Sequence, residues 1–85
     1  MKTYYAVGKY LGYDEVDRES LVFFKIETQA HDYYYKVLFE DPRNVDKLAV
    51  FYIEDNMITR AYGLRPVNFD LKCGPVGPIT EEQFI

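Results

Sequence analysis

The chain is poor in the residues that most often carry metal, redox or nucleophilic chemistry. Its 85 residues include no Trp, one Cys and one His. With Cys73 alone no intramolecular disulfide can form, so a cytoplasmic location is expected. One His and one Cys cannot assemble a zinc site, and the acidic residues around Arg18 lack the regular spacing of a calcium loop. We therefore expect no bound metal and no cofactor.

A catalytic apparatus is also missing from the sequence. The run Gly74–Pro78 after Cys73 supplies neither a base nor a helix N-terminus to activate the thiol, and it lacks the Lys and Ser/Thr of a phosphate-binding loop. His31 stands beside Asp32 in a segment expected to be a turn, where no second group orients an imidazole. The sequence thus predicts that the protein is not an enzyme. The alternative, catalysis by carboxylates and tyrosine hydroxyls, requires a cleft that holds at least two titratable groups with shifted pKa values.

Long apolar runs and an excess of positive charge are absent too. No run approaches the ~20 apolar residues of a membrane span, and Met1–Tyr5 lacks the apolar stretch of a signal peptide. Ten Lys and Arg against fourteen Asp and Glu give a formal charge of -4. This balance disfavours non-specific binding to nucleic acid or to an anionic membrane, and it favours encounter with a basic surface on another protein.

Aromatic side chains, by contrast, are abundant. Nine Tyr and six Phe make up 18% of the chain, and each can bury roughly 150–250 Å². That area suits a dense core in one small β domain covering residues 1–85, with residues 63–85 as an irregular closing segment. This segment is rich in Pro and Gly and includes a short strand expected at residues 67–71. A capping box at residues 80–83 predicts a final helical turn that presses its apolar end into the domain.

Strand-like patterns dominate the rest of the chain. Residues 3–11 are rich in aromatic and β-branched types, and Gly8 inside them indicates a bulge or a close backbone approach. Residues 21–28 and 33–40 form the clearest pair, a hairpin closed by the turn 29–32. Its register sets Val22 opposite Phe39, Phe24 opposite Val37, and Ile26 opposite Tyr35. That register makes one face of the hairpin uniformly apolar, as a core face should be.

The segment 47–54 allows two interpretations. Asn44 can cap a helix there, but the β-branched and aromatic run favours a strand, with Asp55-Asn56 as a two-residue turn into residues 57–62. We adopt strand–turn–strand, with Ile53 opposite Ile58 and Phe51 opposite Arg60. Taken together, the patterns predict a mainly β fold. It is a small antiparallel five-stranded sheet, curled into a barrel or a two-layer sandwich.

The other face of the predicted hairpin is the candidate binding surface. Its apolar anchors are Phe23, Tyr34 and Leu38, and Lys25 and Lys36 stand among the charges at its rim. Either residues 63–85 cover this face or a partner does. The acidic loop contributes Asp14, Glu15 and Asp17, which act either as a solvated loop or as a recognition site for a basic patch.

The leading hypothesis is a small acidic cytoplasmic protein-binding module, an inhibitor or adaptor that occupies a surface of a larger protein. Formation of a homodimer through the same face is a close variant, and a viral or mobile-element origin is compatible with such a module. The alternative is a nucleic-acid or nucleotide-binding small β barrel that uses Lys9, Lys25, Lys36 and tyrosines on one sheet face. Salt separates the two, because phosphate-driven affinity falls steeply with ionic strength and an apolar protein interface barely responds.

Overall fold

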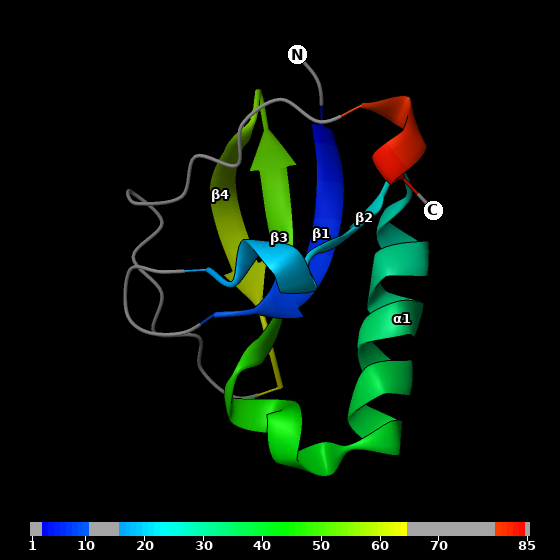
Figure 1. The fold of residues 1–85 in the computed structure, drawn as a ribbon, viewed down its shortest axis with the longest axis vertical. Helices are drawn as coiled ribbons and strands as arrows, with labels where there is room; N and C mark the ends of the chain where they lie inside the picture. The colour runs from blue at the N-terminus through cyan, green and yellow to red at the C-terminus, as the bar shows by residue number, and fades with distance from the viewer. Residues whose placement is uncertain (1–2, 11–15, 65–79, 85) are drawn as a thin grey trace.

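The computed structural model describes residues 3–10, 16–64 and 80–84. These residues form four strands, one α-helix and three short 3₁₀ helices (Figure 1). In chain order they are β1 (Thr3–Lys9), η1 (Arg18–Ser20), β2 (Val22–Phe24), α1 (Glu27–Glu40), η2 (Pro42–Asp46), β3 (Leu48–Glu54), β4 (Met57–Tyr62) and η4 (Glu81–Gln83). The fold is mainly β, as the sequence predicts, with one long helix that the sequence analysis did not foresee.

The strands form an open antiparallel sheet in the order β2-β1-β3-β4. Its centre is the pairing of β1 with β3, which runs from Thr3 opposite Glu54 to Lys9 opposite Leu48. The short strand β2 and the strand β4 are its edges. Five strands and a closed barrel are therefore not supported in the part of the chain that the structure describes, and the strand expected at residues 67–71 lies outside that part.

The largest correction concerns residues 21–40, which do not form a hairpin. Only β2 is a strand there, and it pairs with β1 through Val22 opposite Val7, Phe23 opposite Ala6 and Phe24 opposite Tyr5. The predicted pairs with Val37 and Phe39 are absent, because residues 27–40 form α1. The buried residues of this helix are Ala30, Tyr34 and Leu38. Their spacing of four places them in one stripe along the helix, so a single face packs on the sheet.

The end of α1 and the path into β3 follow the local sequence. The N–H of Asp41 donates to the carbonyl of Val37, and Pro42 cannot continue the helical hydrogen bonds. The Asp41 side chain then accepts the N–H of Arg43 at 3.3 Å, which opens η2. The alternative of a helix capped by Asn44 over residues 47–54 is therefore wrong, because η2 ends at Asp46 and β3 follows it.

The hairpin of β3 and β4 is also confirmed, with one change of register. Its turn residues Asp55 and Asn56 have φ values of 52° and 66°, as a two-residue hairpin turn with two left-handed residues requires. Ile53 lies opposite Ile58 as predicted. Phe51, however, lies opposite Ala61 and not Arg60, because a bulge shifts the register by one residue between Tyr52 and Ile53.

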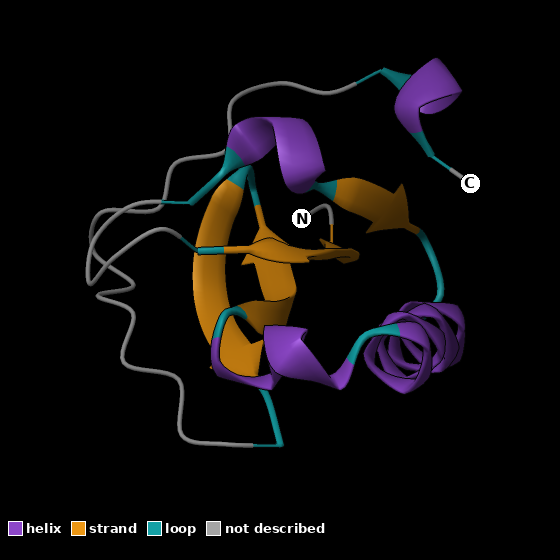
Figure 2. Ribbon diagram, turned by 60° about the horizontal axis from the view of Figure 1, so that its bottom comes forward, coloured by secondary structure: helices purple, strands orange, loops and turns teal. Residues whose placement is uncertain are grey.

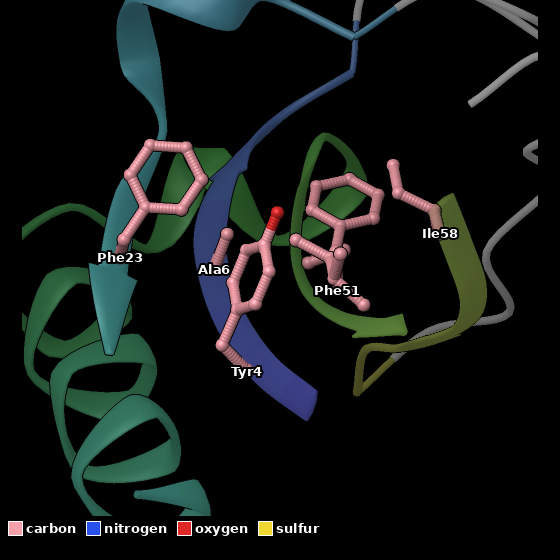
Figure 3. Close-up of a cluster of buried hydrophobic side chains, with 7 residues drawn as sticks. Tyr4, Ala6, Phe23, Phe51 and Ile58 are labelled. Atoms are coloured by element: carbon pink, nitrogen blue, oxygen red, sulfur yellow. The ribbon is translucent and has the colours of Figure 1, made fainter. Parts of the chain in front are cut away.

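Both faces of the sheet are buried. On one face, Ala30, Tyr34 and Leu38 of α1 pack against a cluster that includes Val7 and Val50. On the other face, side chains from all four strands share a second cluster, which includes Tyr4, Ala6, Phe23, Phe51 and Ile58 (Figure 3). Figure 2 shows η1 and η4 on the side of the sheet away from α1. The central strands are therefore apolar on both sides, as their near-continuous hydrophobic sequences require.

The residue Gly8 marks a close approach of β1 to the residues before β2. A Cβ atom there would lie 2.6 Å from Cδ2 of Leu21 and 3.2 Å from its Cα. The neighbouring backbone is held in place because the Ser20 hydroxyl accepts the N–H of Lys9 at 2.8 Å and donates to the carbonyl of Asp17 at 2.6 Å. Of the two alternatives predicted for Gly8, a bulge or a close backbone approach, the structure shows the close approach.

We expect Gly8→Ala to lower the free energy of unfolding by about 1–3 kcal/mol, the usual cost of forcing extra volume into a packed site. Urea denaturation measures it. In a Leu21→Ala background the same substitution should cost less, since the nearest clashing carbon is then gone. An equal cost in both backgrounds would show that Leu21 is not the obstacle.

Candidate functional site

The predicted apolar anchors do not form a surface. Tyr34 has 0% of its surface exposed, and Phe23 and Leu38 have 7% each. Phe23 lies in the cluster on one face of the sheet, whereas Tyr34 and Leu38 lie under α1 on the other. The prediction placed them together because it read the segment as a strand, in which alternate residues share a face. In the helix α1 Tyr34 and Leu38 point inward, while Phe23 is in strand β2 and is buried on the other face.

The charged residues predicted at the rim are also separated. Lys25 lies between β2 and α1 and forms an ion pair with Glu81, while Lys36 is exposed in the middle of α1. Lys25 and Lys36 therefore do not lie together on one face. Both the protein-binding and the nucleic-acid hypotheses had placed them together. Asp17 is half-buried and its carbonyl accepts the Ser20 hydroxyl. Asp14 and Glu15 lie outside the described residues, so a binding role for the acidic loop stays a prediction.

An exposed apolar surface lies instead at the end of α1. Phe39, which was predicted to face the core, exposes 89% of its surface, and Leu64 exposes 57%. A groove of about 520 Å³ runs between them. We call it the α1–η2 groove; its lining residues are Tyr35, Leu38, Phe39, Pro42, Val45 and Leu64. Except for the Tyr35 hydroxyl, the side chains of this lining are hydrocarbon.

Hydrogen bonds fix the walls of the α1–η2 groove. The Tyr34 hydroxyl accepts the backbone N–H of Leu64 at 2.9 Å, and the hydroxyls of Tyr35 and Tyr62 lie 2.9 Å apart. Together they tie the end of β4 and the following residue Leu64 to α1. Burial raises the pKa of Tyr34, and the bond to Tyr62 is the main cause of a raised pKa at Tyr35. Both phenols are therefore neutral and able to hydrogen-bond at physiological pH.

The floor of the groove is shaped by the turn at η2. Arg43 Nε donates to Asp41 Oδ1 at 3.0 Å, and this guanidinium lowers the pKa of the Asp41 carboxyl. The bond closes the turn that brings Pro42 and Val45 beside the helix. The groove thus depends on local turn chemistry at η2 and on the hydrogen bonds of Tyr34 and Tyr35. The spacing of Ala30, Tyr34 and Leu38 is the sequence signal for the helix that lines one side of it.

His31 does not stand at a hairpin tip, as predicted, but in the second turn of α1. Its Nε2 lies 2.7 Å from the hydroxyl of Tyr52, and its ring lies 5.0 Å from that of Tyr62. The guanidinium of Arg60 stacks over the Tyr52 ring at 4.5 Å. Burial, followed by the Glu27 carboxylate, raises the pKa of Tyr52. His31 lines neither the α1–η2 groove nor the groove beside Phe84, so we assign it to the packing of α1 on β3 and β4.

A second, smaller groove of about 280 Å³ lies at the opposite side of the sheet. Its lining residues are Thr3, Tyr4, Lys25, Glu81 and Phe84. Here Phe84 packs edge-to-face on Tyr4 with ring centroids 5.5 Å apart. The predicted helical turn at residues 80–83 is confirmed as η4, and its apolar end reaches the core as expected.

Metal-binding clusters and membrane-spanning helices are both absent from the described residues. Among residues 3–10, 16–64 and 80–84, no group of three or more His, Cys, Asp or Glu side chains is arranged to hold a metal ion. In the same ranges no helix has the length and apolar character needed to cross a membrane.

Comparison of the chain with family models, with curated proteins and with solved structures finds no match.

We expect Tyr34→Phe to lower the free energy of unfolding by about 1–2 kcal/mol, because the N–H of Leu64 loses its acceptor in a partly buried place. Tyr35→Phe is the matched control, since it also removes one tyrosine hydroxyl but from an exposed bond, and it should cost no more than about 0.5 kcal/mol. Urea denaturation compares the two. Equal losses would contradict the assignment of Tyr34 as the internal anchor of Leu64.

Stability should fall in alkali. Burial is the main cause of raised pKa values at Tyr4, Tyr10, Tyr34 and Tyr52. In the unfolded chain these phenols ionise near pH ~10, before they do so in the fold. Their contribution is therefore complete below pH ~10 and is lost as the pH rises toward the raised values. Phenolate absorbance and circular dichroism, recorded together, should change together; full ionisation without unfolding would contradict the expected coupling.

Proposed function

We propose that this protein is a small protein-binding module that holds its partner at the α1–η2 groove. The observation that carries this proposal is the exposure of Phe39, 89%, at the mouth of an apolar groove of about 520 Å³. Fully burying a Phe side chain contributes about 1.5–3 kcal/mol, so a partner that covers Phe39 gains a strong central contact. Aromatic anchors beside a pocket are typical of the residues that dominate binding energy in protein interfaces.

The surroundings of the groove support the same conclusion. Lys36, Glu40 and Arg43 are exposed, and each follows a lining residue of the groove in the sequence. Charged neighbours of this kind suit the polar rim that commonly encloses an apolar interface centre. The hydrogen bonds of Tyr34 and Tyr35 hold its walls before any partner arrives, which lowers the entropic cost of binding. The partner we envisage presents an apolar side chain that enters the groove and an apolar surface that covers Phe39.

In this proposal the protein acts as an inhibitor or adaptor by occupying a surface of a larger cytoplasmic protein. The formal charge of -4 increases the rate of encounter with a basic partner without setting the contact itself. The nucleic-acid alternative gains nothing from the geometry, because Lys25 is paired with Glu81 and does not join Lys36.

Affinity capture with the native chain, Phe39→Lys and Met57→Lys tests the proposal. Met57 is exposed by 42% and belongs to the other end of β4, so its substitution controls for an added surface charge. We expect one stoichiometric partner with the native chain and with Met57→Lys. Phe39→Lys should weaken its binding by about 30-fold or more, the size of an interface hot spot. Titration of the purified partner measures this ratio.

The controls decide between the outcomes. Both variants should keep the circular dichroism and the denaturation midpoint of the native chain, because both side chains are exposed. A partner that binds Phe39→Lys and the native chain equally would place its site elsewhere and end the proposal. Capture that nuclease abolishes would favour the nucleic-acid alternative. Sedimentation of the native chain that gives a dimer lost with Phe39→Lys would identify the partner as a second copy.

A further inference from the structure

The segment Thr80–Phe84 lies on the outer edge of the sheet as a docked element. Phe84 pairs with Phe23 of β2 through an isolated parallel bridge. Its ring packs edge-to-face on Tyr4 at 5.5 Å and lies 6.4 Å from the ring of Phe23. Figure 1 shows η4 beside the end of β2, far along the chain from the strands that it contacts. The segment therefore occupies a position that an added strand would take in a peptide complex.

Lys25 contacts two side chains of this segment, Glu81 and Phe84. Lys25 Nζ donates to Glu81 Oε1 at 2.6 Å and lies 5.3 Å from the centre of the Phe84 ring. An ammonium group thus meets a carboxylate and, three residues later, the face of an aromatic ring. The side chains of Lys25 and Glu81 are 55% and 74% exposed, so solvent and salt reach this contact.

The docked segment holds its own shape through local bonds. The N–H of Thr80 donates to Gln83 Oε1 at 2.8 Å, and the N–H of Gln83 donates to the carbonyl of Thr80 at 3.0 Å. This reciprocal capping fixes one turn and presents Glu81 and Phe84 together. A five-residue sequence is therefore enough to carry the recognised features.

The receiving edge is suited to a replaceable occupant. β2 has three residues and is an edge of the sheet in the described part of the chain. An edge strand offers backbone N–H and C=O groups to any extended segment that reaches it. The groove of about 280 Å³ beside Tyr4 and Phe84 shows that the docked ring leaves space next to it.

We propose that the β2 edge, with Tyr4, Phe23 and Lys25, is a peptide-recognition site that is occupied here by the chain's own residues 80–84. Its external ligand is a segment of a partner protein with an acidic residue three positions before an aromatic one, entering parallel to β2. This site is separate from the α1–η2 groove, which faces the opposite side of the sheet. The chain's own segment competes with the partner, because a tethered ligand acts at an effective concentration of ~1 mM.

The test uses the full-length chain and a synthetic peptide with blocked ends, Thr-Glu-Glu-Gln-Phe, which reproduces residues 80–84. The receptor is the Phe84→Ala chain, in which the internal ligand has lost its ring. Addition of the peptide at concentrations up to several times ~1 mM should shift the amide resonances of Tyr4, Phe23 and Lys25 in a saturable way. The native chain should bind the same peptide ~10-fold more weakly, since its site is already filled.

A charge exchange provides the matched control. Lys25→Glu in the Phe84→Ala receptor should weaken binding of the native peptide several-fold, and a peptide with Glu81→Lys should restore it. A peptide with Phe84→Ala should cause no saturable shift. These results would support recognition of both the carboxylate and the ring.

Two results would overturn the proposal. One is a folded Phe84→Ala receptor whose resonances do not respond to the peptide. The other is a response that is the same for the native, Glu81→Lys and Phe84→Ala peptides. If Phe84→Ala does not fold, the chain with Glu81→Lys, which keeps the ring and loses the ion pair, takes its place as receptor. Binding of the Phe39→Lys chain to its partner is not needed for any of these measurements, so the two proposals stand or fall independently.

Discussion

The pairing of β1 with β3 is the constraint on which the rest of the structure depends. Ala6, Val7, Val50, Phe51 and Ile53 on these strands are essentially inaccessible to solvent, and they alternate between the two faces of the sheet. Because a strand pair that is apolar on both faces cannot stand in water, each face needs its own cover. In a chain of 85 residues those covers must come from short segments. One cover is the helix α1 and part of the other is the segment Thr80–Phe84, and this difference determines which side chains remain exposed for binding.

On one face the cover is α1, and it explains the candidate binding groove. A helix can turn only one stripe toward a flat sheet. The stripe here is Ala30, Tyr34 and Leu38, so other apolar residues of the same helix, above all Phe39, face outward. The tyrosines contribute to both sides of this arrangement, because the Tyr34 hydroxyl anchors Leu64 from within while Tyr35 bonds to Tyr62 at the rim. The apolar groove is thus a consequence of how the core is closed.

On the other face part of the cover is of a weaker kind. Phe84 reaches the cluster around Tyr4 and Phe23 from a five-residue segment that is attached by one backbone bridge, ring contacts and an exposed ion pair. The exposed ion pair contributes about 0–1 kcal/mol, so this segment is held mainly by the contacts of one ring, whereas α1 buries three side chains. The helix is therefore an integral part of the domain, whereas the segment resembles a bound ligand. The two surfaces proposed for binding reflect this asymmetry.

The sequence by itself determined the elements whose signals are local. The residues of β1, the β3–β4 hairpin with its Asp55-Asn56 turn, and the capping box at Thr80 were all readable, because strand alternation, left-handed turn residues and caps involve neighbours only. Residues 27–40 were not. Their Tyr, Val and Phe favour a strand by intrinsic preference, and only burial of the helical stripe against the finished sheet makes α1 the better state. A change of period from 2 to 3.6 residues then moved Tyr34 and Leu38 inward and Phe39 outward, so the binding surface was decided by the tertiary structure.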